Sequence, residues 1–312
     1  MIATRNRLDY LCDALDSALE QIGVDLEVIV VDDGSTDGTP AFLAGLSDER
    51  VRTLRLDPAR GVAQARNEAI GQARGTWIAF LDDDDLWAPH KLTRQLEAAR
   101  ETGAHWVFCD ILLISPEGDV ARVDVTRDSA TILEQLLRHN VVQAGNSTVV
   151  VKADRLRDVG GFDAAFNNPW DLWIRLAAQN DVAVVEEPLV AYRRHATSFI
   201  SGNRERALRE ARELALKHRG LSEQHGVEFD VAGLDDWLRA ERVRGLRSAA
   251  TIEVRAGRRL SAVALQARAL AHSRSRADLR RLVGIASDAR RAGEVRKTWT
   301  EGVPDWLARR LA

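Results

Sequence analysis

Apolar runs of strand length alternate with stretches of helical periodicity along the first two hundred residues. The runs with the length of buried strands are 26–31, 51–56, 77–81, 105–114, 148–151 and 182–185. The stretches with helical periodicity are 8–22, 40–46, 61–70, 89–102, 130–139 and 167–177. Because parallel strands need helical crossovers, this order predicts an α/β fold with a mostly parallel, three-layer sheet.

The chain departs from this alternation in two places. The turn Ser115-Pro116-Glu117-Gly118 predicts that strand 105–114 forms a hairpin with residues 120–125. After Gly202 only helices are expected, at 204–219, 234–256, 260–272, 278–291 and 303–311. We therefore expect two domains, an α/β domain of residues 1–200 and an all-α region of residues 201–312.

Charge is distributed unevenly between these two parts. Residues 1–200 carry 20 basic and 32 acidic side chains, whereas residues 201–312 carry 24 and 15. The arginines of the second part, with Trp237, Trp299 and Trp306, fit docking on an anionic membrane surface. They also fit a solvated helical appendage that packs against the first domain, which we favour. No nucleic-acid-binding module accompanies them, so no nucleic-acid partner is expected.

The two cysteines, Cys12 and Cys109, lie far apart and lack metal-ligand spacing. This predicts reduced thiols in a cytoplasmic protein, at most peripheral to the inner face of the cell membrane. The start of the sequence has no apolar signal core, and no apolar run reaches the length of a membrane span. A membrane-spanning or secreted protein is therefore not expected.

Four consecutive carboxylates, Asp82–Asp85, directly follow the predicted strand 77–81. Open α/β sheets bind ligands at the carboxyl ends of their strands, so this stretch is a candidate site. The acids repel one another unless they face a divalent cation or solvent, and hard oxygen ligands suit Mg²⁺ or Mn²⁺. The alternative is a solvated acidic turn that caps the helix starting near Pro89.

Several short motifs occur in a fixed order along residues 1–200. They are T-R-N-R (4–7), V-I-V-V-D-D-G-S-T-D (28–37), G-V-A-Q-A-R-N (61–67), F-L-D-D-D-D-L-W-A-P-H-K (80–91), G-G-F-D (160–163), W-D-L-W-I-R-L (170–176) and Y-R-R-H (192–195). In this order and spacing they resemble the inverting nucleotide-sugar glycosyltransferases of family 2. The resemblance implies the Rossmann-like GT-A fold, a nucleoside-diphosphate sugar donor and a divalent cation.

The resemblance also implies roles for individual acids. Asp82, Asp83 and Asp84 match the family's Asp-x-Asp element, which makes Asp82 and Asp84 the metal ligands. Asp83 would then reach the ribose or the sugar of the donor. In the D-D-G-S loop, Asp33 would accept a hydrogen bond from an N–H of the base, and Asp32 would support it.

Other donor contacts follow in the same way. Thr4 and Arg5 follow the first strand, where the Arg5 guanidinium would stack on the base or contact a phosphate. Arg66 and Asn67 match an element that lines the donor pocket, although a salt bridge from Arg66 to one of the aspartates fits as well. His195 resembles a late histidine that some members place on the metal or diphosphate; a surface histidine fits equally.

The first strand departs from the family pattern. Only Met1, Ile2 and Ala3 precede the T-R-N-R motif, where the family has five or six apolar residues. Either the strand is truncated or the start of the protein lies upstream. A truncated strand at this place would weaken both stability and donor binding.

The catalytic base is the second departure, because an inverting transferase needs a group that takes the proton of the acceptor hydroxyl. The family has a Glu-Asp pair before the W-D-L-W helix, whereas this chain has Asn168 and Pro169. Asp171 is the nearest carboxylate, but it lies about 200° around the helix from position 169. As an acid in the first turn, it fits stabilisation of the helix dipole equally well.

The leading hypothesis is a metal-dependent inverting glycosyltransferase of polysaccharide biosynthesis. It would move a sugar from a UDP-type donor to a hydroxyl of a glycan or lipid-linked acceptor, with Asp171 as the candidate base. The alternative is a noncatalytic nucleotide-sugar-binding or scaffold protein that has lost the base. A sugar-nucleotide pyrophosphorylase ranks third, because the glycine-rich basic triphosphate loop is missing.

Overall fold

The computed structural model describes residues 1–114, 120–122, 131–142, 145–166, 169–193, 204–255, 258–287 and 304–311. The chain divides into two compact units, one of residues 1–193 with 304–312 and one of residues 194–303. The sequence placed a single division near Gly202, whereas the structure assigns the end of the chain to the first unit.

A parallel sheet of four strands forms one half of the first unit. Its strands are β1 (Ile2–Thr4), β2 (Val28–Asp32), β3 (Val51–Arg55) and β5 (Leu81–Asp82), in the order β3-β2-β1-β5. The crossovers carry helices α1 (Leu8–Leu19), α2 (Thr39–Ala44) and α3 (Val62–Gln72). The predicted α/β class and the parallel pairing of these strands are confirmed.

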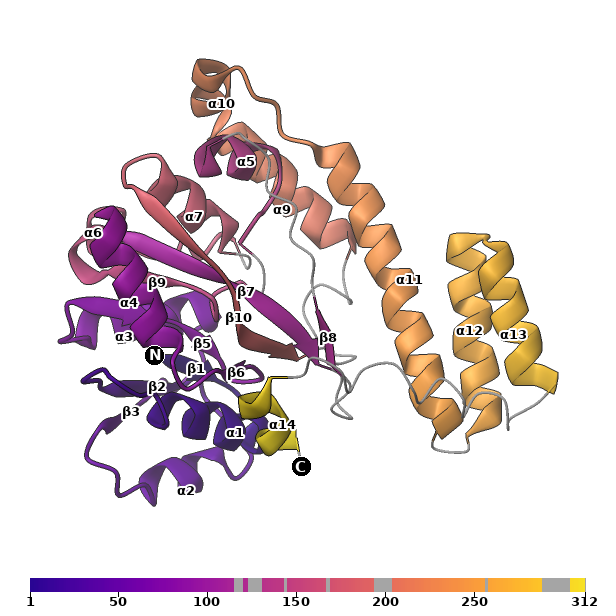
Figure 1. Cartoon of the computed structure of the whole chain (residues 1–312), viewed down its shortest axis with the longest axis horizontal. Helices are drawn as coiled ribbons and strands as arrows, with labels where there is room; N and C mark the ends of the chain where they lie inside the picture. The colour runs from indigo at the N-terminus through magenta and orange to yellow at the C-terminus, as the bar shows by residue number, and fades with distance from the viewer. Residues whose placement is uncertain are drawn as a thin grey trace. The chain divides into compact units, whose positions relative to one another are not determined.

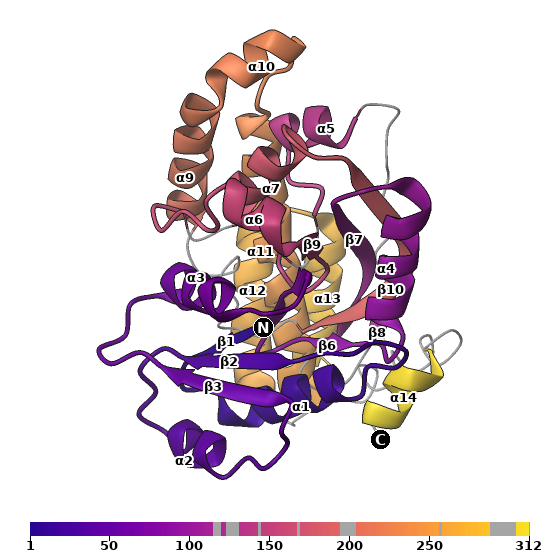
Figure 2. The same cartoon turned by 90° about the vertical axis from the view of Figure 1, so that its left-hand side faces the viewer.

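Both faces of this sheet are buried, because successive side chains of a strand point to opposite sides. Val28 and Val30 of β2 share a core with α1, whereas Ile29 and Val31 share another with α3. Figure 2 shows α1 and α3 on opposite sides of these strands. The uninterrupted apolar run of β2 is therefore the signature of a three-layer arrangement.

A second, mixed sheet completes the first unit. Its strands are β4 (Trp77–Ala79), β9 (Val150–Lys152), β7 (Trp106–Ile114), β10 (Val182–Arg193) and β6 (Leu86–Trp87), with β8 (Val120–Arg122) paired to β7. Among the described strands of this sheet, β7 and β10 pair in parallel and the other pairs are antiparallel. The β7–β8 hairpin is confirmed, and the predicted continuation at 123–125 lies outside the described residues.

Helices α4 (Lys91–Thr102), α5 (Ile132–Arg138), α6 (Ala153–Asp158) and α7 (Trp170–Ala177) also belong to the first unit. The sequence analysis missed α6, which has only six residues. Helix α14 (Asp305–Leu311) returns to this unit, where Trp306 packs against the core and Leu307 is buried. Trp306 is therefore not a membrane anchor in this arrangement.

The second unit is all helical within its described residues. Its helices are α9 (Arg204–Lys217), α10 (Arg219–His225), α11 (Val231–Arg255), α12 (Arg259–Ser273) and α13 (Arg276–Ser287). The helix predicted at 204–219 ends at Lys217, and the next one starts at Arg219 with His218 as its N-cap. No described helix of the chain is long and apolar enough to cross a membrane.

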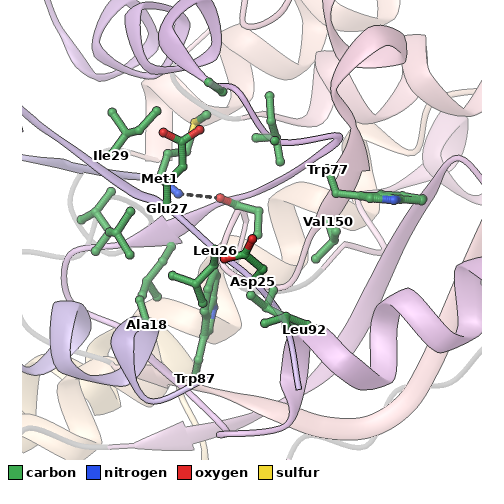
Figure 3. A pocket seen from close by; sticks show the side chains of 18 of the residues that line it. Met1, Ala18, Asp25, Leu26, Glu27, Ile29, Trp77, Trp87, Leu92 and Val150 are labelled. Carbon is green, nitrogen blue, oxygen red and sulfur yellow. Dashed lines mark hydrogen bonds between the residues drawn. The ribbon is translucent and has the colours of Figure 1, made fainter. Parts of the chain in front are cut away.

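A cavity of about 140 Å³ opens beside the start of β1. Its lining is mainly apolar and includes Ala18, Leu26 and Trp87 (Figure 3). The amino group of Met1 lies there and donates a hydrogen bond to the Ala79 carbonyl at 2.7 Å. Burial lowers the pKa of this amine to about 5. None of Asp82–Asp85 lines the cavity, so it is not the candidate site.

Lys91 is a fully buried cation in the core of the first unit. Its Nζ lies 4.2 Å from the centre of the Trp87 ring and has no hydrogen-bond partner within the described part of the chain. Burial lowers the pKa of the ammonium to about 8, although Cys109 opposes the shift. The unfolded chain therefore binds more protons than the folded protein between about pH 8 and the ordinary lysine pKa near 10.5.

The free energy of unfolding is therefore expected to rise with pH over this window, by up to about 3 kcal/mol from Lys91 alone. Lys91→Met keeps the length of the side chain and removes the charge, so it should stabilise the protein at pH 7 and abolish the Lys91 part of the rise. Urea unfolding of both proteins at a series of pH values measures this. If the free energy of unfolding rose equally with pH in both proteins, the lowered pKa of Lys91 would be contradicted.

Candidate active site

The carboxyl ends of β1, β2 and β5 meet at one edge of the parallel sheet. Thr4 pairs with Asp32, and Ala3 pairs with Asp82, so the loops after these strands emerge side by side. The Thr4 hydroxyl donates to the Asp83 carboxylate at 2.8 Å, across 79 positions of sequence. The topology therefore brings the sequence-predicted residues Thr4, Asp32, Asp33 and Asp82–Asp84 to one place.

Two arginines pair with the first three carboxylates of the acidic stretch. Arg66 donates to Asp82 at 2.6 Å, which is the salt bridge considered from the sequence. A single nitrogen of Arg7 lies 3.0 Å from Asp83 and 2.7 Å from Asp84. Burial, and secondarily Asp84, raise the pKa of Asp83 to about 6, while Arg7 opposes the rise.

Asp85 differs from its neighbours because it is fully buried and because its hydrogen bonds join separate segments of the chain. It accepts hydrogen bonds from the Ser147 hydroxyl at 2.5 Å and the Arg193 backbone N–H at 3.0 Å. Burial first, then Asp84 and Asp82, raise its pKa well above the ordinary value. Asp85 therefore ties the acidic turn to the end of β10 and to the segment before β9.

Asp32 and Asp33 accept hydrogen bonds from their own loop, from β3 and from the loop after β3. Asp32 accepts from the Ser35 backbone N–H at 2.8 Å and from Arg55. Asp33 accepts from the backbone N–H groups of Arg60 and Gly61 at 2.6 and 2.9 Å. These bonds shape the loops around the sheet edge, and recognition of a base by Asp33 stays a prediction.

Of the other residues predicted to contact the sugar donor, Arg5 is exposed, whereas Arg66 and Asn67 contact other parts of the protein. Arg5 is exposed at the sheet edge. The guanidinium of Arg66 lies 5.3 Å from the centre of the Phe162 ring. The Asn67 amide donates to the Phe162 carbonyl and accepts from its N–H, both at 2.8 Å. In this structure Asn67 therefore fixes the G-G-F-D turn, and a direct contact with the donor stays untested.

The Gly145–Ser147 segment is a part of the site that the sequence analysis did not identify. The Asn146 side chain is 2% exposed and donates to Asp82 at 3.3 Å, but its oxygen has no partner among the described residues. A Cβ at Gly145 would lie 3.9 Å from Pro169 and 4.0 Å from an Asp82 oxygen. Pro169, at the position of the family's base, therefore lies on the same side of the site as Asp82.

Asp171 lies in a buried ion pair rather than at an open surface. It is 2% exposed and accepts from Arg175 at 2.7 Å. Arg175 also donates to the carbonyls of Val159 and Gly161, so the pair ties α7 to the G-G-F-D turn. This geometry favours a structural role for Asp171. Asn168 and His195 lie outside the described residues.

The residues of the site that the sequence analysis missed are Arg7, Asn146, Ser147 and Arg193. Arg7 and Arg193 belong to quoted motifs, T-R-N-R and Y-R-R-H, but their partners are distant in sequence. Within the described ranges, no three His, Cys, Asp or Glu side chains come together as a metal-binding group. Asp82 accepts hydrogen bonds from both Arg66 and Asn146, and Asp84 accepts one from Arg7.

Comparison with known proteins gives matches over the region that contains this site. Residues 1–150 match the family model described as "Glycosyl transferase family 2". A segment of 123 residues is 45% identical to the succinoglycan biosynthesis protein ExoO of Rhizobium meliloti, and it covers 39% of this chain and 35% of that protein. The chain therefore spans only about a third of this relative.

Two further matches extend beyond residue 150. The β-1,3-glucosyltransferase WfgD of Escherichia coli, named for UDP-Glc and α-D-GlcNAc-diphosphoundecaprenol, is 26% identical over 63% of this chain and 76% of its own length. The crystal structure of S. aureus TarS 1-349 in complex with UDP-GlcNAc has a TM-score of 0.55 at 17% identity. It covers 87% of this chain and 80% of that one, and it supports the GT-A fold.

If the Asp171–Arg175 pair is structural, Asp171→Asn should lower the free energy of unfolding by about 2 kcal/mol, because Arg175 loses its charged partner. Arg175→Gln should cost a similar amount, and the double variant should cost clearly less than the sum. Urea unfolding of the three variants gives this coupling. Loss of activity in Asp171→Asn with unchanged stability would instead identify a chemical role.

Proposed function

We propose that this chain transfers a sugar from a nucleoside-diphosphate sugar to a hydroxyl of a glycan or lipid-linked acceptor, because its residues 1–150 match the glycosyl transferase family 2 model. The observation that carries the proposal is the convergence of Thr4, Asp33 and Asp82–Asp84 at one edge of the parallel sheet. This edge is where open α/β folds bind nucleotides.

The donor in this proposal is of the UDP type, and transfer proceeds with inversion. Two similar proteins support the nucleotide: WfgD is named for UDP-Glc, and the TarS structure contains UDP-GlcNAc. Inversion rests on the motif resemblance to inverting transferases. The name of WfgD also supports a lipid-linked diphosphate acceptor.

We propose that Mg²⁺ or Mn²⁺ binds at this edge. The donor set fits a hard cation, because Asp82 and Asp84 supply carboxylates. Asn146, whose nitrogen donates to Asp82, adds a buried side-chain oxygen that has no partner among the described residues. A bound cation would neutralise the charge that grows on the leaving diphosphate. Arg7 must leave Asp84 to free that carboxylate.

The chain's own residues have distinct tasks in this proposal. Thr4 orients the Asp83 carboxylate, which we assign to the ribose or sugar hydroxyls of the donor. Arg66 and Arg7 place positive charge where the diphosphate would lie. Exposed Arg5 is free to lie over the base or a phosphate. Asp33 keeps the loop at residues 60–61 in place while it reads the base.

The cell compartment that we propose is the cytoplasm. Neither Cys12 nor Cys109 forms a disulfide, and Cys109 is buried. Cysteines outside disulfides are typical of a reducing compartment.

A noncatalytic nucleotide-sugar-binding protein is the second candidate, and two observations favour it. Pro169 cannot accept a proton at the position of the family's base. The nearest alternative, Asp171, is buried against Arg175. The two candidates differ in turnover but not in donor binding.

Calorimetric titration with UDP, GDP and dTDP, each with and without Mn²⁺, tests the donor site. We expect one nucleotide to bind tightly only with Mn²⁺, and Asp84→Ala to weaken it by at least about tenfold, since a metal carboxylate is lost. The control is Asp158→Ala, whose side chain is 63% exposed on α6. No binding to any nucleotide, or equal loss in both variants, contradicts the proposed site.

Turnover separates the two candidates once a nucleotide is known. Release of the nucleoside diphosphate from its sugar donor, in the presence of acceptor hydroxyls, is expected for the transferase. Donor binding without release across a panel of sugars and acceptors would identify the binding protein instead.

A further inference from the structure

Helices α12 and α13 of the second unit form a hairpin whose charge is almost entirely of one sign. They pack side by side (Figure 1). Residues 259–287 contain six arginines and a single acid, Asp278. The arginines are Arg259, Arg268, Arg274, Arg276, Arg280 and Arg281, and all are exposed.

The one acid does not offset this charge at the surface. Asp278 is fully buried and accepts two hydrogen bonds from Arg247 of α11, at 2.7 and 2.5 Å. Gln266 and Ser275 donate to the same carboxylate, each at 3.0 Å. The arginines of the hairpin therefore face solvent, whereas its one acid is buried and hydrogen-bonded inside the helical unit.

Large apolar side chains are exposed among these arginines. Leu260 on α12 is 88% exposed, and Leu279 and Val283 on α13 are 50% and 57% exposed. Along α13, Arg276, Leu279, Arg280 and Val283 follow the spacing i, i+3, i+4, i+7 and so form one stripe. Asp278 points to the opposite, buried side of the helix.

We propose that this stripe docks on the surface of an anionic lipid bilayer. Arginines bind the headgroups of anionic lipids, and leucine and valine side chains gain free energy at the headgroup–acyl boundary. A soluble polyanion such as a nucleic acid or an acidic glycan would satisfy the arginines but leave Leu279 and Val283 in water. The combination of single-sign charge and exposed apolar side chains therefore selects a bilayer.

One arginine of the hairpin has a structural task. Arg259 donates to the backbone carbonyls of Ile285 and Ala286 and so caps the carboxyl end of α13. The charges assigned to lipid are therefore those of the stripe, Arg276 and Arg280. This docking goes beyond the proposed sugar transfer, since it concerns where the chain is held and not what it transfers.

Flotation of the full chain with lipid vesicles tests the proposal. The chain should bind vesicles of phosphatidylcholine with about one third phosphatidylglycerol, bind far less to phosphatidylcholine alone, and lose binding with added salt. Arg276→Glu with Arg280→Glu should weaken binding by at least about tenfold. Leu279→Ser, which leaves the charge unchanged, should weaken it several-fold.

The matched control is Arg209→Glu with Arg212→Glu, which makes the same change of charge at exposed positions of α9. Equal loss of binding in this control would overturn the assignment to the hairpin. So would unchanged binding of Leu279→Ser together with full competition by soluble polyphosphate, which would identify a polyanion site.

Circular dichroism and thermal unfolding show whether the variants remain folded, and nucleotide binding serves as a second readout. Retained nucleotide binding with lost vesicle binding supports the docking surface. Failure of wild-type vesicle binding overturns it and leaves the donor site untouched.

Discussion

Repulsion among the four neighbouring carboxylates Asp82–Asp85 is the constraint on which the rest of the first unit depends. The fold opposes each acid with a donor, namely Arg66 for Asp82, Thr4 and Arg7 for Asp83, Arg7 for Asp84, and Ser147 with the Arg193 backbone for Asp85. These donors come from β1 and the loop after it, α3, the segment before β9 and the end of β10. The hydrogen bonds to the acids therefore also fix these segments around one edge of the sheet.

The same charges suit the edge to the ligand that we propose. Because Arg7 bridges Asp83 and Asp84, a cation bound there would compete with Arg7 for these carboxylates. A diphosphate that arrives with a divalent cation brings charges that largely cancel, and its phosphates offer Arg7 new acceptors. Binding of both together exchanges one set of ion pairs for another and avoids burying an unpaired charge.

Periodicity predicted the strands and helices that cover the parallel sheet, because both are local patterns. Apart from the β7–β8 hairpin, which its turn residues predicted, the antiparallel pairs of the second sheet were not predicted, and neither was the short helix α6, since strand pairing is tertiary and six residues carry little pattern. Motifs located Asp82–Asp84, whereas Arg7 and Asn146 act through partners more than sixty positions away. The Asp171–Arg175 pair was visible as an i, i+4 spacing, which signals an ion pair as readily as a catalytic acid.

The central claim is that the acidic edge of the parallel sheet binds a metal–nucleotide pair by displacing Arg7. A crystal structure of the protein with UDP and Mn²⁺, with the metal located by its anomalous scattering, tests it most directly. The account predicts Mn²⁺ bound to an oxygen of Asp84 and Arg7 turned from Asp84 toward the diphosphate. Nucleotide and metal bound elsewhere, with Arg7 still bridging Asp83 and Asp84, would contradict it.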